Sequence, residues 1–156
     1  MSTNSYYSIA NEEYLFLKSS VHSNIYNSIA FLAEQVVEKY LKHVVQEFCV
    51  GHPEAEVVLK THNLPKLDYV IKESGIDLGL DIRDLRMLKD FYFDARYPGE
   101  NYIRVSKEEA NECIAIVDYV KRKVANFIES EGYCKICGSK LLSTGKCSNF
   151  DCDGNL

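Results

Sequence analysis

Apolar residues recur every three or four positions through most of residues 1–130, which is the period of helices that turn one face toward a core. The clearest stretch spans residues 23–48, where a main apolar stripe is widened by a second row. The stripe consists of Ile25, Ile29, Leu32, Val36, Tyr40, Val44 and Phe48, and the second row of Val37, Leu41 and Val45. A shorter helix is predicted before it, over about residues 8–20, with the apolar set Ile9, Tyr14, Leu15 and Leu17.

The polar positions of the 23–48 segment fall on the remaining side of the same helix. They are Glu34, Glu38, Lys39 and Lys42. Glu38 and Lys42 lie one turn apart, with the acid first, which is the favourable order for an ion pair within a helix. This pattern favours a solvated face, on which Lys39 and Lys42 are exposed.

Turn and capping residues divide the rest of the chain. Gly51 and Pro53 predict a loop over residues 49–63. After it, a helix is expected over about 64–74, with Asn63 as its N-cap. The next should run from Asp81 to about Arg96–Tyr97, just before Pro98. The last should begin at the Ser106/Glu109 capping box and end before Gly132. The prediction is an all-α up-down bundle of about five helices over residues 1–130, followed by a separate tail over 131–156.

Composition narrows the classes of partner. The chain has 156 residues, 46% of them apolar, and a net charge of −5, all of it in residues 1–130. An acidic chain does not coat nucleic acid non-specifically, so no DNA binding is predicted and any phosphate contact must be local. The N-terminus shows no secretory signal and no apolar run has the length of a membrane span. A cytoplasmic protein without membrane contact is therefore expected.

The tail carries four cysteines at metal-binding spacing. Cys134 and Cys137 form a CxxC followed by Gly138, and Cys147 and Cys152 form a wider CxxxxC. Four thiolates suit tetrahedral zinc and close its coordination sphere, so the expected cofactor is structural Zn. The tail has too little apolar content to order itself, and metal binding would supply that free energy. Two disulfides or a redox CxxC are the alternatives, and Cys49 and Cys113 are predicted to lie in the helical core.

Four segments resemble HEPN domains (higher-eukaryote and prokaryote nucleotide-binding). Residues 33–42 (AEQVVEKYLK) are similar to the family's "QAvEKaLK" helix, and residues 61–64 (THNL) with Leu67 to its "tHdL..L" segment. Residues 95–99 (ARYPG) are similar to its "aRYP" turn, and Glu108, Glu109 and Ala110 begin a matching final helix. These motifs occur in the family's order across about residues 6–128.

The resemblance implies an all-α bundle that commonly forms a homodimer. Many bacterial members stand beside a minimal nucleotidyltransferase in toxin–antitoxin pairs, and others are metal-independent endoribonucleases that use Arg, four to six residues, then His. Here no His follows Arg96 within that window, and Asn101 occupies the nearest position. Asn does not relay protons near neutral pH, so a non-catalytic or degenerate protein is expected. Its candidate nucleotide-binding residues are Arg96, Tyr97 and Lys39.

Two other functions stay open. One is an endoribonuclease toxin with a variant catalytic site built from Arg96, Asn101 and Tyr102. The other is an interaction module that docks a protein partner through the zinc tail. For single residues, plainer roles compete: Arg96 as a helix cap or a partner of Asp94 or Glu100, Tyr97 and Tyr102 as packing residues, and His62 as a loop or cap residue.

Overall fold

The computed structural model describes residues 5–155, and these residues form a helical bundle with no extended strand among them. This confirms the predicted all-α class. The elements are α1 (Tyr6–Ser19), α2 (Tyr26–Phe48), α3 (Ala55–Val58), α4 (Leu64–Glu73), α5 (Ile82–Asp94), α6 (Lys107–Ser130) and a final 3-10 turn, η1 (Asp153–Asn155). The first four residues of the predicted helical domain and the last residue of the tail lie outside the described residues.

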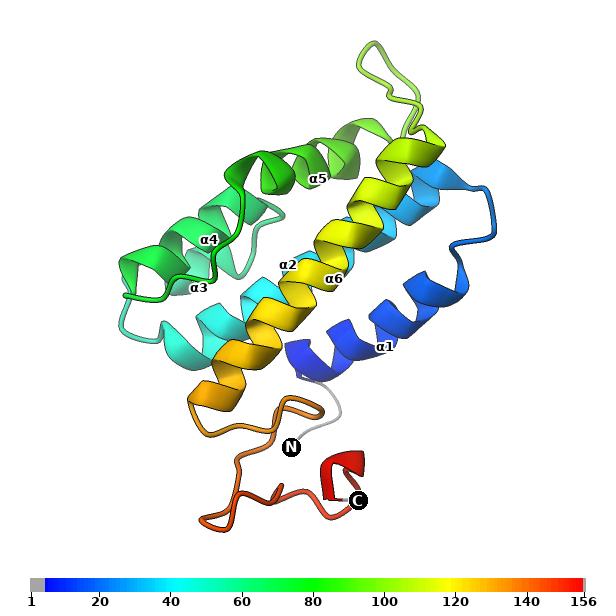
Figure 1. Ribbon diagram of the computed structural model, residues 1–156. Coiled ribbons are helices and arrows are strands. Elements are labelled where there is room, and N and C mark those ends of the chain that lie inside the picture. The colour runs from blue at the N-terminus through cyan, green and yellow to red at the C-terminus, as the bar shows by residue number, and fades with distance from the viewer. Residues whose placement is uncertain (1–4, 156) are drawn as a thin grey trace.

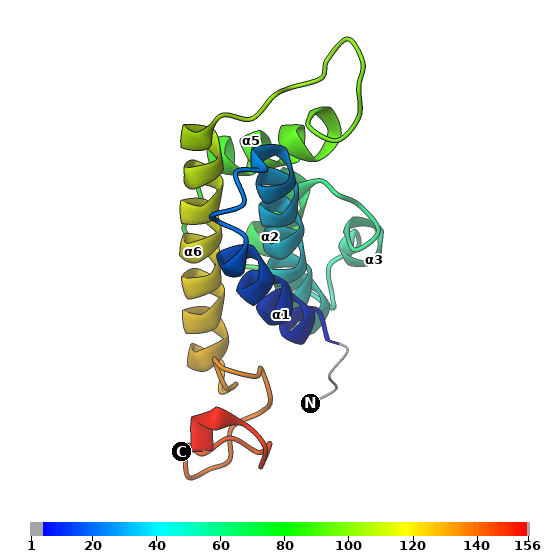
Figure 2. The same ribbon diagram turned by 90° about the vertical axis from the view of Figure 1, so that its right-hand side faces the viewer.

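Helix α2 is the centre of the bundle. It packs against α1, α4, α5 and α6, and it runs behind α6 in Figure 1. Figure 2 shows α6 and α3 on opposite sides of α2. A helix surrounded in this way must bury more than one face, which explains the doubled apolar row in its sequence.

Capping side chains set where several helices begin, as the sequence predicted. The Asn63 side chain accepts a hydrogen bond from the Lys66 amide, and that of Asp81 accepts one from the Arg83 amide. Ser106 and Glu109 form a complete capping box at the start of α6. Such caps satisfy amide groups that the first turn leaves without a partner.

The predicted loop over 49–63 contains a short helix, α3, which the sequence pattern did not predict. Four residues are too few to show a helical period, and Ala55 and Val58 form this turn because they are buried against the core. Helix α5 ends at Asp94, before the predicted Arg96–Tyr97, and its C-cap is Ala95.

Some predicted core positions are exposed, and some predicted surface positions are buried. Leu15 is 69% exposed and Ile25 59%, because α1 buries Tyr7, Ala10 and Leu17 instead and Ile25 precedes the first turn of α2. The predicted solvated face of α2 is wrong in the opposite sense. Three of its four polar residues are buried, namely Glu34, Glu38 and Lys42. Cys49 and Cys113 lie in the core as predicted.

Candidate nucleotide-binding face and metal centre

One asparagine of α2 holds the loop between α5 and α6, which projects beyond both helices in Figure 1. The Asn27 side chain reaches both ends of this loop, residues 95–105. Its Nδ2 lies 2.9 Å from the Ala95 and Ile103 carbonyl oxygens and 3.1 Å from Tyr102 Oη, and its Oδ1 accepts a hydrogen bond of 2.8 Å from the Val105 amide. A single side-chain amide therefore fixes the loop that carries Arg96, Tyr97, Asn101 and Tyr102.

The Arg96 guanidinium rests on aromatic rings. Its Cζ lies 4.6 Å from the ring centre of Phe31, 4.7 Å from that of Tyr92 and 5.0 Å from that of Tyr97. Its Nη2 donates a hydrogen bond of 3.1 Å to Tyr97 Oη. Arg96 is exposed, and within residues 5–155 no carboxylate forms an ion pair with it. Its charge is therefore oriented without being neutralised by Asp94 or Glu100.

The predicted site residues separate into groups. Arg96 and Tyr97 line one small cavity of about 190 Å³ together with Phe31, whereas Tyr102 lines a different one of about 590 Å³. Asn101 is exposed, and its side chain makes no hydrogen bond to any described residue. Lys39 lies in an ion pair of 2.8 Å with Glu13 of α1. The structure thus brings Arg96 together with Tyr97 and not with Asn101, Tyr102 or Lys39.

A histidine outside the predicted site lies beside this cluster. The His62 ring stacks on Tyr92, with ring centres 4.5 Å apart and planes 20° from parallel. Its Nδ1 lies 2.7 Å from Glu38 Oε2. Tyr92 therefore contacts both His62 and Arg96. Sequence spacing gave no signal for this arrangement, because His62 and Glu38 come from separate elements and Glu38 reads as a solvated position.

Glu38, the partner of His62, belongs to a group of buried charged residues on α2. Glu38 Oε1 accepts a hydrogen bond of 2.7 Å from Lys42 Nζ, as the sequence predicted, although the pair is buried rather than exposed. Glu34, one turn earlier on α2, is fully buried and accepts a hydrogen bond from Gln35. Burial raises the pKa of Glu34 to about 8, and the neighbouring Glu38 carboxylate adds to this effect. Glu34, Glu38 and Lys42 are therefore buried ionisable residues of α2, and Glu38 connects them to the exposed ring of His62.

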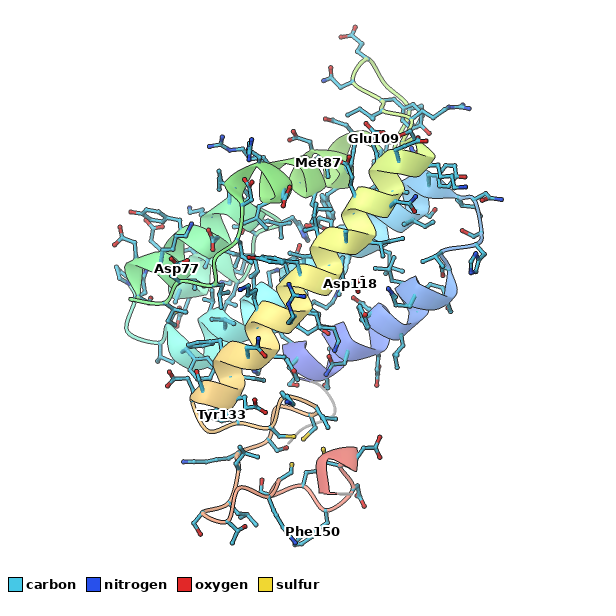
Figure 3. All side chains as sticks on the ribbon, in the orientation of Figure 1. Asp77, Met87, Glu109, Asp118, Tyr133 and Phe150 are labelled. Atoms are coloured by element: carbon cyan, nitrogen blue, oxygen red, sulfur yellow. The ribbon has the colours of Figure 1, made fainter. Side chains whose placement is uncertain are left out.

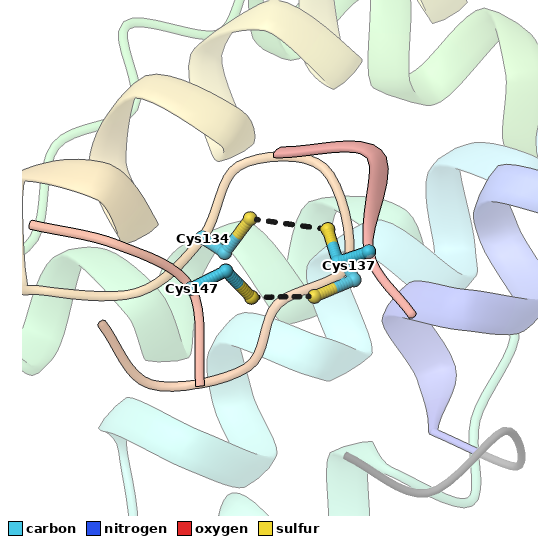
Figure 4. Close-up of side chains that lie close together, drawn as sticks. Cys134, Cys137 and Cys147 are labelled. Carbon is cyan, nitrogen blue, oxygen red and sulfur yellow. Dashed lines mark hydrogen bonds between the residues drawn. The ribbon is translucent and has the colours of Figure 1, made fainter. Parts of the chain in front are cut away.

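The four tail cysteines converge on one point. Their sulfurs all lie within 4.8 Å of one another, and Figure 4 shows the labelled Cys134, Cys137 and Cys147 pointing inward. The Cys134–Cys152 and Cys137–Cys147 sulfurs are 3.7 and 3.4 Å apart, too far for disulfide bonds. A tetrahedral ion about 2.3 Å from each sulfur would space them about 3.8 Å apart. The cluster can therefore hold a metal ion.

Backbone amides make hydrogen bonds in both halves of the cluster. Gly138 has φ +79°, and its amide donates a hydrogen bond of 2.7 Å to the Cys134 carbonyl, which closes the first turn. In the wider second half, the Asn149 amide points to Cys147 Sγ at 3.4 Å and the Gly154 amide to Cys152 Sγ at 3.3 Å. The CxxxxC half therefore has two amide–sulfur contacts.

The cysteine cluster is attached to the bundle through its main chain. The Tyr7 hydroxyl donates to the Lys135 carbonyl, and Asn11 Nδ2 donates to the Ile136 carbonyl at 3.1 Å. Tyr40 Oη in turn donates to Asn11 Oδ1 at 2.6 Å. Figure 3 shows the tail, from Tyr133 to Phe150, below the end of α6, with Phe150 pointing into solvent.

The described residues thus form an all-helical bundle with an exposed arginine on aromatic rings and an appended four-cysteine tail. The HEPN domain family matches residues 3–127, and the chain belongs to this family. The match supports a nucleotide- or RNA-associated function in general, and it ends before the cysteine tail. Neither the curated proteins nor the solved structures gave a significant match. Among the described helices, none is both long and apolar enough to cross a membrane.

Proposed function

We propose that this protein binds a phosphate of a nucleotide or an RNA strand at Arg96. The observation that carries the proposal is the exposed guanidinium held on three aromatic rings without a carboxylate partner among the described residues. A planar guanidinium binds phosphate oxygens through two parallel N–H groups, and the ring faces limit its rotamers before a ligand arrives. The Tyr97 hydroxyl, which accepts a hydrogen bond from Arg96, is a second group beside the guanidinium that can donate to a phosphate.

Binding at Arg96 is tested with short fluorescent single-stranded RNA and with ATP and GTP. We expect Arg96→Ala to weaken binding at least tenfold, and Arg96→Lys to restore only part of it, because Lys keeps the charge but not the planar pair of donors. The matched control is Arg104→Ala, which removes an equal exposed charge from the same loop. Equal losses in both variants would contradict the proposal, since they would indicate a general charge effect.

The proposal includes assembly as a homodimer beside a partner such as a minimal nucleotidyltransferase. The family resemblance supports both parts. The neighbouring side chains Leu15 and Phe16 on α1, 69% and 64% exposed, support a protein interface. Light scattering of the purified chain measures its oligomeric state, and a monomer at micromolar concentration would contradict the dimer. A nucleotidyltransferase gene beside the gene for this protein would support the proposed partner.

We also propose that the metal of the tail is zinc in a structural role. Four thiolates leave no open position for a substrate, and sulfur ligands select Zn²⁺ over oxygen-preferring cations. Metal analysis of the reduced protein should find about one equivalent of zinc, because structural sites bind tightly. Less than about half an equivalent would contradict this assignment.

A second candidate function is protein docking through the tail. Phe150 is 92% exposed and Leu142 is 50% exposed on the same small module. Apolar side chains without cover are common at interaction surfaces. This function would be favoured over phosphate binding if neither nucleotide nor RNA binds while Phe150→Ser abolishes binding of a protein encoded next to this chain.

A further inference from the structure

A cavity of about 330 Å³ lies where the cysteine tail meets the bundle. One wall is the C-terminal part of α2, with His43 and Glu47, and the other belongs to the tail, with Ser139 and Lys140. The bundle carries the loop over residues 95–105 at its opposite end, as Figure 1 shows. Sites for small ligands begin at about 300 Å³, so the cavity has room for one small molecule.

Two buried polar side chains of this cavity have no hydrogen-bond partner. His43 is 3% exposed and Ser139 5%, and neither His43 Nδ1 nor Ser139 Oγ bonds to any described residue. Within the described part of the chain, the other buried side-chain atoms in this state are single oxygens of Glu34 and Asp68, carboxylates whose second oxygen is bonded. Buried polar groups are normally paired, so two unpaired groups at one cavity indicate a place that receives polar groups.

These two side chains suit a polar group of a ligand that carries no charge. Burial lowers the pKa of His43 to about 4, so its ring is neutral near pH 7 and has one donor and one acceptor nitrogen. The ring packs against that of Tyr7, with centres 5.1 Å apart. The Ser139 hydroxyl also donates and accepts. A charged group bound here would be buried without a charge of opposite sign, which is costly.

An acidic and a basic side chain also line the cavity without meeting. Glu47 of α2 and Lys140 of the tail are both exposed, and neither forms an ion pair with the other or with any further described residue. Ser5, the N-cap of α1, lines the cavity as well, and the first turn of α1 has no acidic residue to offset the positive end of that helix. A ligand with one negative and one positive group can pair with both free charges.

We infer that this cavity binds a free amino acid whose side chain is polar and uncharged. The carboxylate of the ligand pairs with Lys140, and its ammonium group pairs with Glu47. Its side chain hydrogen bonds to His43 and Ser139. A bound amino acid therefore contacts α2 and the tail at the same time.

Aromatic rings complete the cavity and supply apolar contacts. Phe48 and Tyr133 both line it, and their rings meet edge to face with centres 5.5 Å apart. They offer a surface on which the methylene groups of the ligand can pack. Because the ligand would join the tail to the bundle, its binding should slow hydrogen exchange of the amides in residues 133–141.

The test is calorimetric titration of the full chain, with the metal it carries as purified, against L-serine, L-asparagine and L-glutamine. We expect at least one of them to bind with a dissociation constant below about 1 mM. Two derivatives of that amino acid are the ligand controls. Its N-acetyl form lacks the ammonium charge and its α-amide lacks the carboxylate, so each should bind about tenfold more weakly or worse, because each loses a charged hydrogen bond.

Variants of the two free charges test the same contacts from the protein side. Glu47→Gln and Lys140→Ala should each weaken binding about tenfold or more. Both residues are exposed, so the fold should not change. The matched controls are Glu56→Gln on α3 and Lys146→Ala in the tail, which remove exposed charges outside the cavity and should bind as the wild type does.

Ser139→Ala separates a ligand-binding role from a structural one. It should weaken binding about fivefold, since one neutral hydrogen bond to the ligand is lost. The melting temperature without ligand should not fall, because the hydroxyl has no protein partner to lose. Metal content is measured alongside, since Ser139 lies close to Cys137 in the chain. If the metal is lost, Glu47→Gln decides, because Glu47 lies on α2.

Three results would overturn the inference. The first is no binding of any of the three amino acids at about 10 mM, which would leave water as the partner of His43 and Ser139. The second is binding that Glu47→Gln and Lys140→Ala leave unchanged. The third is equal affinity for the amino acid and both of its derivatives. Each of these results is independent of phosphate binding at Arg96, which Arg96→Ala tests separately.

Discussion

The loop over residues 95–105 and the tail over 131–155 both lack regular helices over most of their length, but they are held in different ways. The loop is fixed by the protein itself, through the side chain of Asn27 and aromatic rings under Arg96. The tail has four sulfurs at its centre and little apolar cover. The comparison shows that the loop is anchored at both ends by contacts with the bundle, whereas the tail is joined to it at one end and gathers four sulfurs that can hold a metal ion.

Of the predicted changes, removal of the metal should have the largest effect, and this effect should be confined to the tail. We expect chelation, or Cys134→Ser, to unfold the tail completely while α1 to α6 keep their helical signal, because metal binding supplies the free energy that orders such modules. Limited proteolysis combined with circular dichroism measures both parts. Ser143→Ala, an exposed change in the same tail, is the control. A tail that stays protected without metal would show that the bundle alone orders it.

Asn27→Ala should have the next largest effect, and it should act on the loop over residues 95–105. It removes several hydrogen bonds at about 1 kcal/mol each, so we expect a loss of about 2–3 kcal/mol in the free energy of unfolding. Binding at Arg96 should weaken as well, while zinc content stays unchanged. Urea denaturation measures the first effect. Asn126→Ala on α6 is exposed and should change neither property, and a similar loss in that variant would contradict the assignment.

The free energy of unfolding should also depend on pH through Glu34, a buried residue of α2. Its pKa is raised from 4.5 to about 8 by burial, so the folded chain keeps a proton that the unfolded chain loses. The free energy of unfolding should therefore fall as pH rises from about 4.5 to about 8. Glu34→Gln should flatten this part of the profile and be more stable than wild type at about pH 8. Urea melts across this pH range measure it, and Glu12→Gln, an exposed change, should leave the slope as it is.

Tyr7→Phe should have the smallest effect, at the contact between tail and bundle. It removes the hydroxyl that donates to the Lys135 carbonyl, so we expect a loss of about 1 kcal/mol. Hydrogen exchange of the amides in residues 133–141 should become faster, with zinc content unchanged. Tyr6→Phe, whose hydroxyl makes no hydrogen bond to a described residue, is the control. Unchanged hydrogen exchange in Tyr7→Phe would show that other contacts attach the tail to the bundle.

Local signals made much of this structure predictable. Helical periods gave the five longer helices, and short spacings gave the Ser106 capping box and the cysteine cluster, because all of these depend on residues close together in the chain. The contacts that define the candidate site are long-range. Asn27 reaches a loop far along the chain, and Glu38 meets His62 from another element. Their sequence context shows only polar residues on a helix, which by itself favours exposure.

The bundle holds the cysteine tail by two carbonyl groups of the main chain, those of Lys135 and Ile136. These two hydrogen bonds do not involve the side chains at positions 135 and 136, although Lys135 Nζ also forms an ion pair of 3.2 Å with Glu129. With the proposed zinc bound by Cys134 and Cys137, the turn between these cysteines would depend on the ion, and docking and metal binding would be linked equilibria. Any factor by which the ion favours docking must equal the factor by which the bundle raises affinity for the ion. The full chain should hold its metal more tightly than an isolated tail peptide.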